Sequence, residues 1–221
     1  VTGTWMGKRG SLRLTFSTMR RTISLALAVS PVSGKTELPD RFKKWLDEEV
    51  VYIISPLERE VFLKLQNDRE RDLFIEAFWK HRDPSPDSAE NEFKTEHYRR
   101  ITYANRYLGR DSTKPGWKTD RGRIYVILGE PNDINRFPSK TDVYDSEIWF
   151  YQGKTEAGLP AGFNLLFFKP NNTGEFRLYS PVSDGPAALL PGYYASAGDY
   201  AEAYNKLFQA DPTLAGVSMS L

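Results

Sequence analysis

Few side chains in this chain could do metal or base chemistry, because its 221 residues include no cysteine and two histidines, His81 and His97. The absence of cysteine excludes disulfides, thiolate zinc sites, thiol nucleophiles and cysteine-bound iron–sulfur clusters. Both histidines fall on apolar stripes of two predicted helices that flank a proline-rich loop, and antiparallel packing would bring them close. With Glu76, Glu92 or Glu96 they could form a cluster that binds zinc or iron. This cluster is the basis of an alternative function, a metal-dependent hydrolase-type enzyme.

A structural role for the two histidines is the favoured interpretation. The chain has neither an HExxH motif nor a paired ExxH spacing, so each histidine is expected at the edge of a core with a satisfied ring nitrogen. The charged run RDPSPDSAENEFKTEH is expected to cap helices and face solvent rather than to supply a catalytic carboxylate pair. We therefore expect no cofactor and favour a non-enzymatic function.

The segment PGWKTDRGRIYVILGEPNDI, residues 115–134, has an apolar run followed by a turn, where many enzymes hold phosphates or nucleophiles. A phosphate loop needs the spacing GxxxxGK[ST] or GxGxxG, and the segment has neither; the chain also lacks a GxSxG nucleophile elbow. Glu130 and Pro131 place a negative charge and a residue without an N–H where an anion would need amides. The segment is therefore not expected to bind phosphate.

The same segment leads to specific structural expectations. Residues 123–128 have the β-branched and aromatic content of a mostly buried strand whose alternate side chains face the core. Trp117 is expected to pack beside the proline-rich loop of the helical part and to join that part to the sheet. Asp120 and Arg121 are expected to hold the turn by hydrogen bonds, which makes Asp120 a structural carboxylate. The exposed features of the turn, and hence the candidate binding residues, are Glu130, Asn132 and Asp133.

The overall charge gives no preference for a charged partner. Thirty basic and 29 acidic residues leave a net charge of +1, so no global field favours nucleic acid or an anionic membrane. An aromatic content of 14% indicates a packed globule or an interaction surface. No stretch reaches the ~18 apolar residues of a membrane-spanning helix. We expect no nucleic-acid partner and no membrane span in the mature chain.

The first 34 residues are expected to form a leader. From Met19 the sequence MRRTISLALAVSPVSG runs from positive to apolar to small residues, as a secretory signal peptide does. The residues before Met19 are then most simply an over-extended start, and the protein is expected outside the cytoplasm, in the periplasm or secreted. The alternative is that residues 11–29 form a β-hairpin that belongs to the fold.

Residues 38–110 are predicted to form four helices. The first begins after Pro39 and has an apolar face made of Phe42, Trp45, Leu46 and Val50. The second begins with Ser55 as N-cap in a capping box with Glu58, and its inward stripe is Leu57, Val61 and Leu65. The third repeats the capping box with Asn67 and Glu70, and its inward face is Phe74, Ala77, Phe78 and His81. The fourth is capped by Asp87 or Ser88, and its stripe is Phe93, His97, Ile101, Ala104 and Leu108.

Residues 116–183 are predicted to form an antiparallel meander of about four strands, at 123–128, 147–152, 163–168 and 175–180. Asn172 and Gly174 can adopt positive φ in the turn between the last two. Residues 184–221 are predicted to be a tail with one helix, beginning after Asp199, which could lead into a further region. The fold class is therefore α+β, with a helical half (38–110) on a β half (116–183) within one domain, 35–183.

The stretch GWKTDRGRIYVILGEPNDI resembles the GWxTD domain, a bacterial family named for the residues that stand here as Gly116, Trp117, Thr119 and Asp120. The runs FWKHRDPSPDSAENEFKTEHYRRITYAN and EIWFYQG match that family's pattern too, so the resemblance covers roughly residues 38–183. Within these motifs, the further residues expected to have structural roles are Arg121, Gly122, Gly129, Pro131, Trp149 and Tyr151. The resemblance implies an exported protein and brings no established activity or catalytic residue.

A fainter similarity, at the level of the fold, is to the small lipoprotein of the outer-membrane β-barrel assembly machinery, which supports an α+β scaffold and transfers no partner. The function expected from the sequence is a non-enzymatic, extracytoplasmic binding or scaffolding domain. Its partner is expected to be an unknown protein of the cell envelope.

Overall fold

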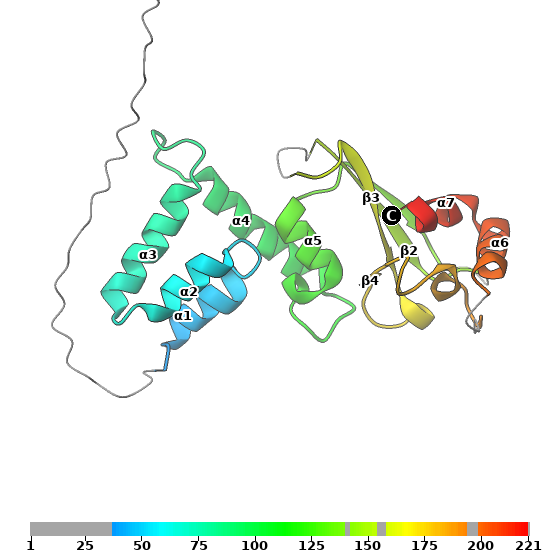
Figure 1. Cartoon of the computed structure of the whole chain (residues 1–221), viewed down its shortest axis with the longest axis horizontal. Coiled ribbons are helices and arrows are strands. Elements are labelled where there is room, and N and C mark those ends of the chain that lie inside the picture. Colours follow the sequence, from blue (N-terminus) through cyan, green and yellow to red (C-terminus); the bar gives the residue numbers. More distant parts are fainter. Residues whose placement is uncertain (1–36, 140–141, 154–157, 194–198, 221) are drawn as a thin grey trace, which may run out of the picture. The chain divides into compact units, whose positions relative to one another are not determined.

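The computed structural model describes residues 37–139, 142–153, 158–193 and 199–220 (Figure 1). All described helices and strands belong to one compact unit, Leu38–Leu221. The leader predicted for residues 1–34 lies outside the described residues.

The amino-terminal part of this unit is helical, as predicted. Its helices are α1 (Asp40–Lys44), which continues as a π-helical turn (Trp45–Glu49), α2 (Pro56–Lys64), α3 (Asp68–His81) and α4 (Glu92–Tyr103), which continues as a second π-helical turn (Ala104–Leu108). A 3-10 turn (Gly116–Lys118) and α5 (Asp120–Leu128) follow. The four inward residues predicted for the first helix are all buried, in a core shared with Phe62, Phe78 and Trp79.

The β part is a four-stranded antiparallel meander in the order β1-β2-β3-β4. Its strands are β1 (Asp133–Phe137), β2 (Ser146–Gln152), β3 (Gly162–Phe168) and β4 (Arg177–Leu178). Trp149 in the middle of β2 stands opposite Ile134 of β1 and Leu165 of β3. Asn172 and Gly174 have positive φ in the connection before β4, as predicted. The α+β class predicted from the sequence is confirmed.

The prediction of a strand at residues 123–128 is wrong, because these residues form most of α5. Thr119 is the N-cap of that helix, and its side chain accepts a hydrogen bond from the Gly122 N–H. Asp120 in the first turn favours a helix start, and Gly129 with φ 84° ends the helix. These end signals outweigh the β-branched content of the run. The first strand of the meander is instead β1, which was not predicted.

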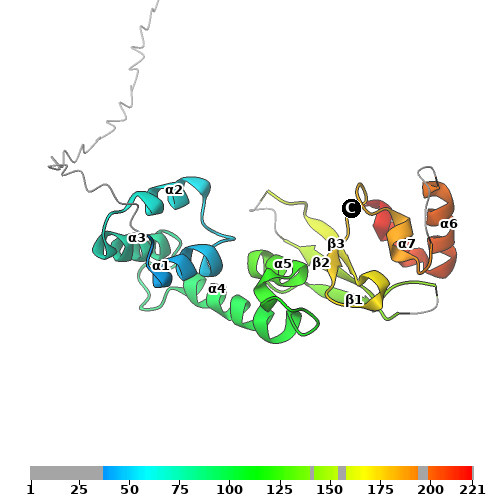
Figure 2. The same cartoon turned by 90° about the horizontal axis from the view of Figure 1, so that it is seen from below.

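Helices cover both faces of the sheet, as Figures 1 and 2 show, with α5 on one side and α6 (Tyr200–Ala210) and α7 (Pro212–Ser220) on the other. Side chains alternate along a strand, so one set of residues faces each layer. The α5 face carries Trp149, Tyr151 and Phe167, which cluster with Tyr125 and Phe176. The opposite face carries Ile148, Leu166 and Phe168, which pack in one cluster with Leu207 and Leu214.

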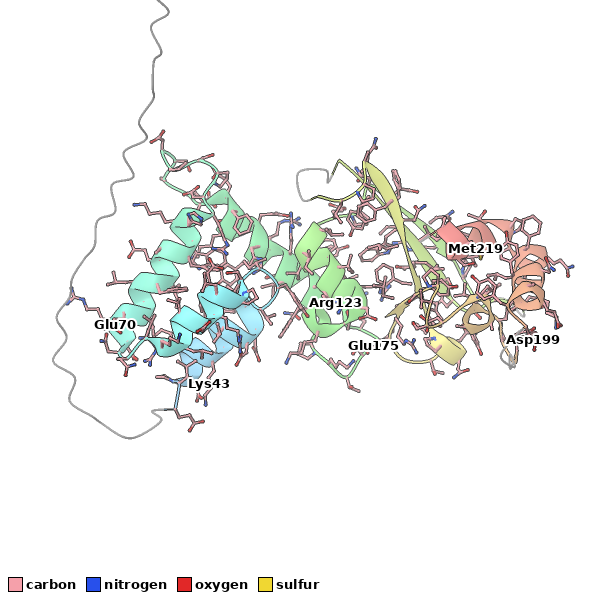
Figure 3. All side chains as sticks on the ribbon, viewed as in Figure 1. Lys43, Glu70, Arg123, Glu175, Asp199 and Met219 are labelled. Atoms are coloured by element: carbon pink, nitrogen blue, oxygen red, sulfur yellow. The ribbon has the colours of Figure 1, made fainter. Side chains whose placement is uncertain are left out.

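Residues 184–221 were predicted to hold one helix, but the described part of this segment contains two, α6 and α7. The hydroxyl of Tyr200 on α6 lies 2.8 Å from the sulfur of Met219 on α7, which is labelled in Figure 3. Ala203, Leu207 and Leu214 are fully buried in the core behind the sheet. The segment is therefore part of the fold, since it covers a sheet face that would otherwise be apolar and open.

The capping prediction for α2 is confirmed, because Ser55 and Glu58 form a capping box. The predicted stripe is wrong at two of its three positions, because Leu57 is 69% and Val61 42% exposed, whereas Leu65 packs against the core as predicted. The residue that is fully buried instead is Phe62. Phe62 packs against Trp45, with ring centroids 4.9 Å apart. An aromatic ring buries more apolar area than an aliphatic side chain, so it decides which face turns inward.

The caps and faces of the next two helices are predicted in part. Asn67 caps α3 as predicted, but Trp79 is buried there while His81 is exposed. The residue that caps α4 is Asn91 rather than Asp87 or Ser88. Asn91 accepts a hydrogen bond from the Lys94 N–H and donates one to the Trp79 carbonyl, each 2.8 Å long. One side chain therefore starts α4 and holds it to α3.

Candidate functional site

Two glycines allow three backbone segments to meet at the GWKTDRG segment. A Cβ placed on Gly116 would lie 2.0 Å from the carbonyl oxygen of Ala104, at the end of α4. A Cβ on Gly122, in the first turn of α5, would lie 1.8 Å from the carbonyl oxygen of Gly116. Backbone atoms cannot give way as the end of a side chain can, so both positions require glycine. Residues 116–122, with the groups they contact, are called the junction below.

Trp117 fills the space between the helical part and α5. Its indole is buried and forms a cluster with Ala104 and Val126, and its ring centroid lies 5.8 Å from that of Tyr52. The Tyr52 hydroxyl donates a hydrogen bond to the Trp117 carbonyl (3.1 Å), and the Trp117 N–H donates one to Asn105 Oδ1 (3.2 Å). The neighbours of Trp117 are therefore the segment after α1 and the end of α4. The proline-rich loop predicted to lie beside it is not among these contacts.

Thr119 and Asp120 use their polar atoms on backbone groups. The Thr119 hydroxyl lies 2.8 Å from the Gly116 carbonyl and 3.2 Å from the Leu108 carbonyl, and its oxygen accepts the Gly122 N–H at 3.0 Å. Asp120 Oδ2 accepts a hydrogen bond from the Leu178 N–H of β4 (2.8 Å), a distant strand rather than the predicted turn. Arg123, labelled on α5 in Figure 3, lies 3.3 Å from Asp120 Oδ1. Asp120 therefore joins α5 to the edge of the sheet.

Arg121 reaches from α5 to a buried carboxylate on β2. Its guanidinium lies 3.2 Å from Glu147 Oε2 and 4.0 Å from the centroid of the Phe176 ring. The Trp149 indole donates a hydrogen bond to the same Glu147 oxygen at 2.9 Å. A buried carboxylate needs such partners, because desolvation without them is strongly unfavourable.

Tyr151, Gly129 and Pro131 complete the group of predicted structural residues, and all three are buried. The Tyr151 hydroxyl donates a hydrogen bond to the Gly129 carbonyl at 3.1 Å. Burial raises the pKa of Tyr151, so this hydroxyl stays protonated. The bond holds the end of α5 against the centre of the sheet.

A cleft of about 180 Å³ opens beside the junction, between the end of α4, α5 and the strands β1 and β2. We call it the tyrosine cleft; its lining residues are Tyr103, Tyr107, Leu108, Arg121, Tyr125, Glu130, Pro131, Ile134, Arg136, Glu147 and Trp149. The Tyr103 ring stacks on Tyr125 at a centroid distance of 4.4 Å and lies 4.7 Å from Tyr107. Arg136 lies 3.5 Å from Glu147 Oε1. Glu147 is thus paired with both Arg121 and Arg136, and aromatic side chains line the cleft around these charges.

The three predicted binding residues are all exposed, but they lie differently with respect to the cleft. Glu130 lines it, whereas Asn132 uses its side-chain oxygen to accept the Gln152 N–H at 2.8 Å, and Asp133 begins β1. Sequence reasoning missed Tyr103, Tyr107 and Arg136. The i,i+4 spacing of the two tyrosines at the end of the predicted helix was the available signal, since it places them on one face.

The two histidines have different environments. His81 is exposed, while His97 is buried and its Nε2 lies 2.6 Å from the Glu49 carbonyl oxygen. Burial lowers the pKa of His97, so a neutral ring donates this hydrogen bond. Glu96, the proposed third ligand, is bound by Arg99 and Arg100. Within the described residues, no group of three His, Asp or Glu side chains is placed to hold a metal ion.

These elements define a small α+β domain, in which a helical part is joined through a glycine-dependent junction to a sheet with helices on both faces. The chain matches the family described as GWxTD domain over residues 32–178 and belongs to that family. The residues that give the family its name are Gly116, Trp117, Thr119 and Asp120 of the junction. No curated protein and no solved structure matches the chain. None of the helices described here is both long and apolar enough to cross a membrane.

Proposed function

We propose that this protein is an extracytoplasmic, non-enzymatic binding domain whose tyrosine cleft receives part of a partner protein of the cell envelope. The observation that carries the proposal is the lining of the cleft. Three tyrosines, a tryptophan and two arginines meet at one concave site. Tyrosine, tryptophan and arginine are the residue types enriched where protein interfaces concentrate their binding energy.

The engagement of the junction's polar groups supports a non-enzymatic role. A nucleophile or general base needs a reactive atom that faces a substrate. Thr119 is buried with its hydroxyl bound to backbone groups, and Asp120 is bound to β4 and to Arg123. The residues that name the family therefore hold the fold, and the side chains that face solvent lie next to them.

The extracytoplasmic location is supported by the positive, apolar and small-residue order from Met19 to Gly34. It can be tested by determining the amino terminus of the protein purified from its native host. Processing near residue 34, with recovery in the envelope or secreted fraction, is expected. An intact leader and recovery in the cytoplasm would contradict this part of the proposal.

Binding at the cleft can be tested by photo-cross-linking in the native host. A photoreactive amino acid is placed at Glu130, which is exposed on the cleft, and in a second strain at Leu73, which is 56% exposed on α3. We expect a discrete protein adduct from position 130, lost when Tyr107→Ala is added, and none from position 73. No adduct at 130, or the same adduct at both positions, would contradict the proposal.

A further inference from the structure

The strand β1 is an edge of the sheet, and its hydrogen-bonding pattern leaves backbone groups directed outward. At the two ends of the β2–β3 pair, the Lys169 N–H donates a hydrogen bond to the Asp145 carbonyl, and the Gly153 N–H donates one to the Ala161 carbonyl. Hydrogen-bonded pairs alternate along an antiparallel ladder. With the β2–β3 register, these two bonds therefore show that the backbone N–H and C=O groups of the odd-numbered residues of β2 point towards β3. Those of the even-numbered residues point towards β1.

The even-numbered residues of β2 stand opposite Asp133, Asn135 and Phe137. The N–H and C=O groups of Ile134 and Arg136 therefore point away from β2. Among the described residues, no backbone group outside the β1–β2 pair bonds to them. β1 thus offers two donors and two acceptors to an added strand.

The side chains of the same two residues line the tyrosine cleft. Residues at i and i+2 of a strand face one side of a sheet, so a strand added beside β1 would direct alternate side chains into this cleft. One side chain would lie next to Ile134, facing the rings of Tyr103 and Tyr107. The next on that face would lie next to Arg136. A single extended ligand could therefore bind the backbone groups of β1 and the tyrosine cleft at the same time.

The charges around the cleft favour an acidic segment. The side chain of Arg136 is 66% exposed. The guanidinium carbons of Arg106 and Arg110 each lie 5.3 Å from the centroid of the Tyr107 ring. Glu147 at the floor is shared by Arg121 (3.2 Å) and Arg136 (3.5 Å), so one carboxylate faces two guanidinium groups. Glu130 is the other anion of the lining, and with Arg106 and Arg110 beside Tyr107 the positive charges outnumber the negative ones. Asp133 alternates to the other face of β1.

We infer that an extended segment of the partner protein adds to the sheet beside β1, with an apolar or aromatic side chain in the tyrosine cleft and an acidic side chain two residues away against Arg136. Backbone hydrogen bonds supply affinity in this mode, and the pockets for alternate side chains supply specificity. The inference rests on the proposed function and specifies how the cleft is used. Pro131 and Pro138 bracket the strand and keep the edge short, which limits indiscriminate pairing.

The test uses a displayed library of random nine-residue peptides, selected on the full chain. We expect enrichment of peptides with an apolar or aromatic residue two positions from an acidic one. Binding of an enriched peptide should slow amide hydrogen exchange at Ile134 and Arg136 at least about tenfold, because both amides acquire acceptors. The amide of Asn135, which already pairs with β2, should change less and serves as the internal reference.

Two variants distinguish the contribution of the backbone edge of β1 to peptide binding from that of the Arg136 side chain. Arg136→Ala removes the guanidinium, and Arg136→Pro also removes the outward N–H without breaking a bond to β2. Peptide affinity should fall about tenfold further in Arg136→Pro than in Arg136→Ala, with similar melting temperatures. Equal affinities and unchanged exchange at Ile134 and Arg136, with binding still dependent on Tyr107, would overturn strand addition and leave the proposed function intact. A failure to enrich any peptide would count against both.

Discussion

The junction and the tyrosine cleft lie side by side, share Arg121, and use their polar groups in opposite ways. In the junction, the side chains of Thr119 and Asp120 are bound to backbone groups of other segments. In the cleft, Tyr107 is 40% exposed and Arg136 reaches into solvent. The residues that name this family therefore explain how its two parts are joined, and the exposed side chains of the proposed binding cleft are their neighbours.

Arg121 shows how the two regions depend on each other. It begins in the first turn of α5, where the cap at Thr119 fixes the helix, and it ends against Glu147 at the floor of the cleft. A change at a junction residue other than Arg121 should therefore alter the cleft only through loss of structure. A change at the rim of the cleft should leave the junction intact.

The largest expected effect is that of Gly116→Ala. The added methyl group would lie 2.0 Å from the Ala104 carbonyl oxygen, so the junction must open. We expect a loss of about 5 kcal/mol in the free energy of unfolding, or failure to fold, measured by urea denaturation. Gly216→Ala in α7 is the control, because nothing lies within 4 Å of its Cβ position. Equal stability of the two variants would show that the close approach at Gly116 is not required.

Trp117→Ala should have the next largest effect. It empties the space among Tyr52, Ala104 and Val126, so the loss should be about 3 to 5 kcal/mol. Equilibrium denaturation is the measurement, and Trp117→Phe, which fills part of the space, should lose less. A loss below about 1 kcal/mol for the alanine variant would instead indicate an indole available for a partner.

Asp120→Ala should have an intermediate effect. It leaves the Leu178 N–H without its acceptor, at an expected loss of about 1 to 3 kcal/mol. Asp120→Asn keeps an oxygen acceptor and should lose less. Faster hydrogen exchange at the Leu178 amide, relative to other amides, would locate the effect at this bond. Unchanged stability and exchange would contradict a structural role for this carboxylate.

A smaller, pH-dependent effect is expected away from both regions, at the ion pair of Glu58 with Arg82 (2.8 Å). Burial would raise the pKa of Glu58, but hydrogen bonds from Arg82 and from Ser55 lower it from 4.5 to about 2. Because the pKa of Glu58 is lower in the folded state, its ionised carboxylate stabilises the fold at pH values above the unfolded-state pKa of about 4.5. This contribution to stability is lost as the pH falls from about 4.5 towards 2.

Glu58→Gln should therefore lose about 1 to 2 kcal/mol at pH 7, and the difference from the parent should shrink between pH 4.5 and 2. Glu60→Gln, at an exposed carboxylate on the same helix, is the control and should show little difference at either pH. A difference for Glu58→Gln that stays constant with pH would contradict this assignment.

The parts of the fold predicted from the sequence are those with a local cause. Capping residues such as Ser55 and Asn67 bond within their own turn, and β2 and β3 contain the continuous apolar and aromatic runs IWFY and LLFF. Residues 123–128 were wrongly predicted to be a strand because apolar side chains occur all along this run. They do so because α5 is buried on two sides, with Tyr125 in one cluster and Val126 in another. The cap at Thr119, four residues earlier, decided the structure.

The tyrosine cleft could not be predicted from the sequence, because its lining residues come from segments that meet only in the folded structure. Tyr103 and Tyr125 are far apart in the chain and stack because the junction brings α5 against the end of α4. Arg136 was missed because residues 134–137 were not predicted to form a strand. Glu130 was correctly predicted to be exposed, since a charged residue after a glycine at a helix end rarely packs inside.

The division between a structural junction and an exposed cleft is tested by comparing Asp120→Ala with Tyr107→Ala, each in the protein with the photoreactive residue at position 130. Denaturation and cross-linking are measured for both variants under conditions where both are folded. Tyr107→Ala is predicted to change the free energy of unfolding by no more than about 0.5 kcal/mol and to lose the adduct. Asp120→Ala is predicted to lose about 1 to 3 kcal/mol and to keep the adduct. The reverse pattern, a stable Asp120→Ala without the adduct and a destabilised Tyr107→Ala that retains it, would show that the junction binds the partner and the cleft holds the fold.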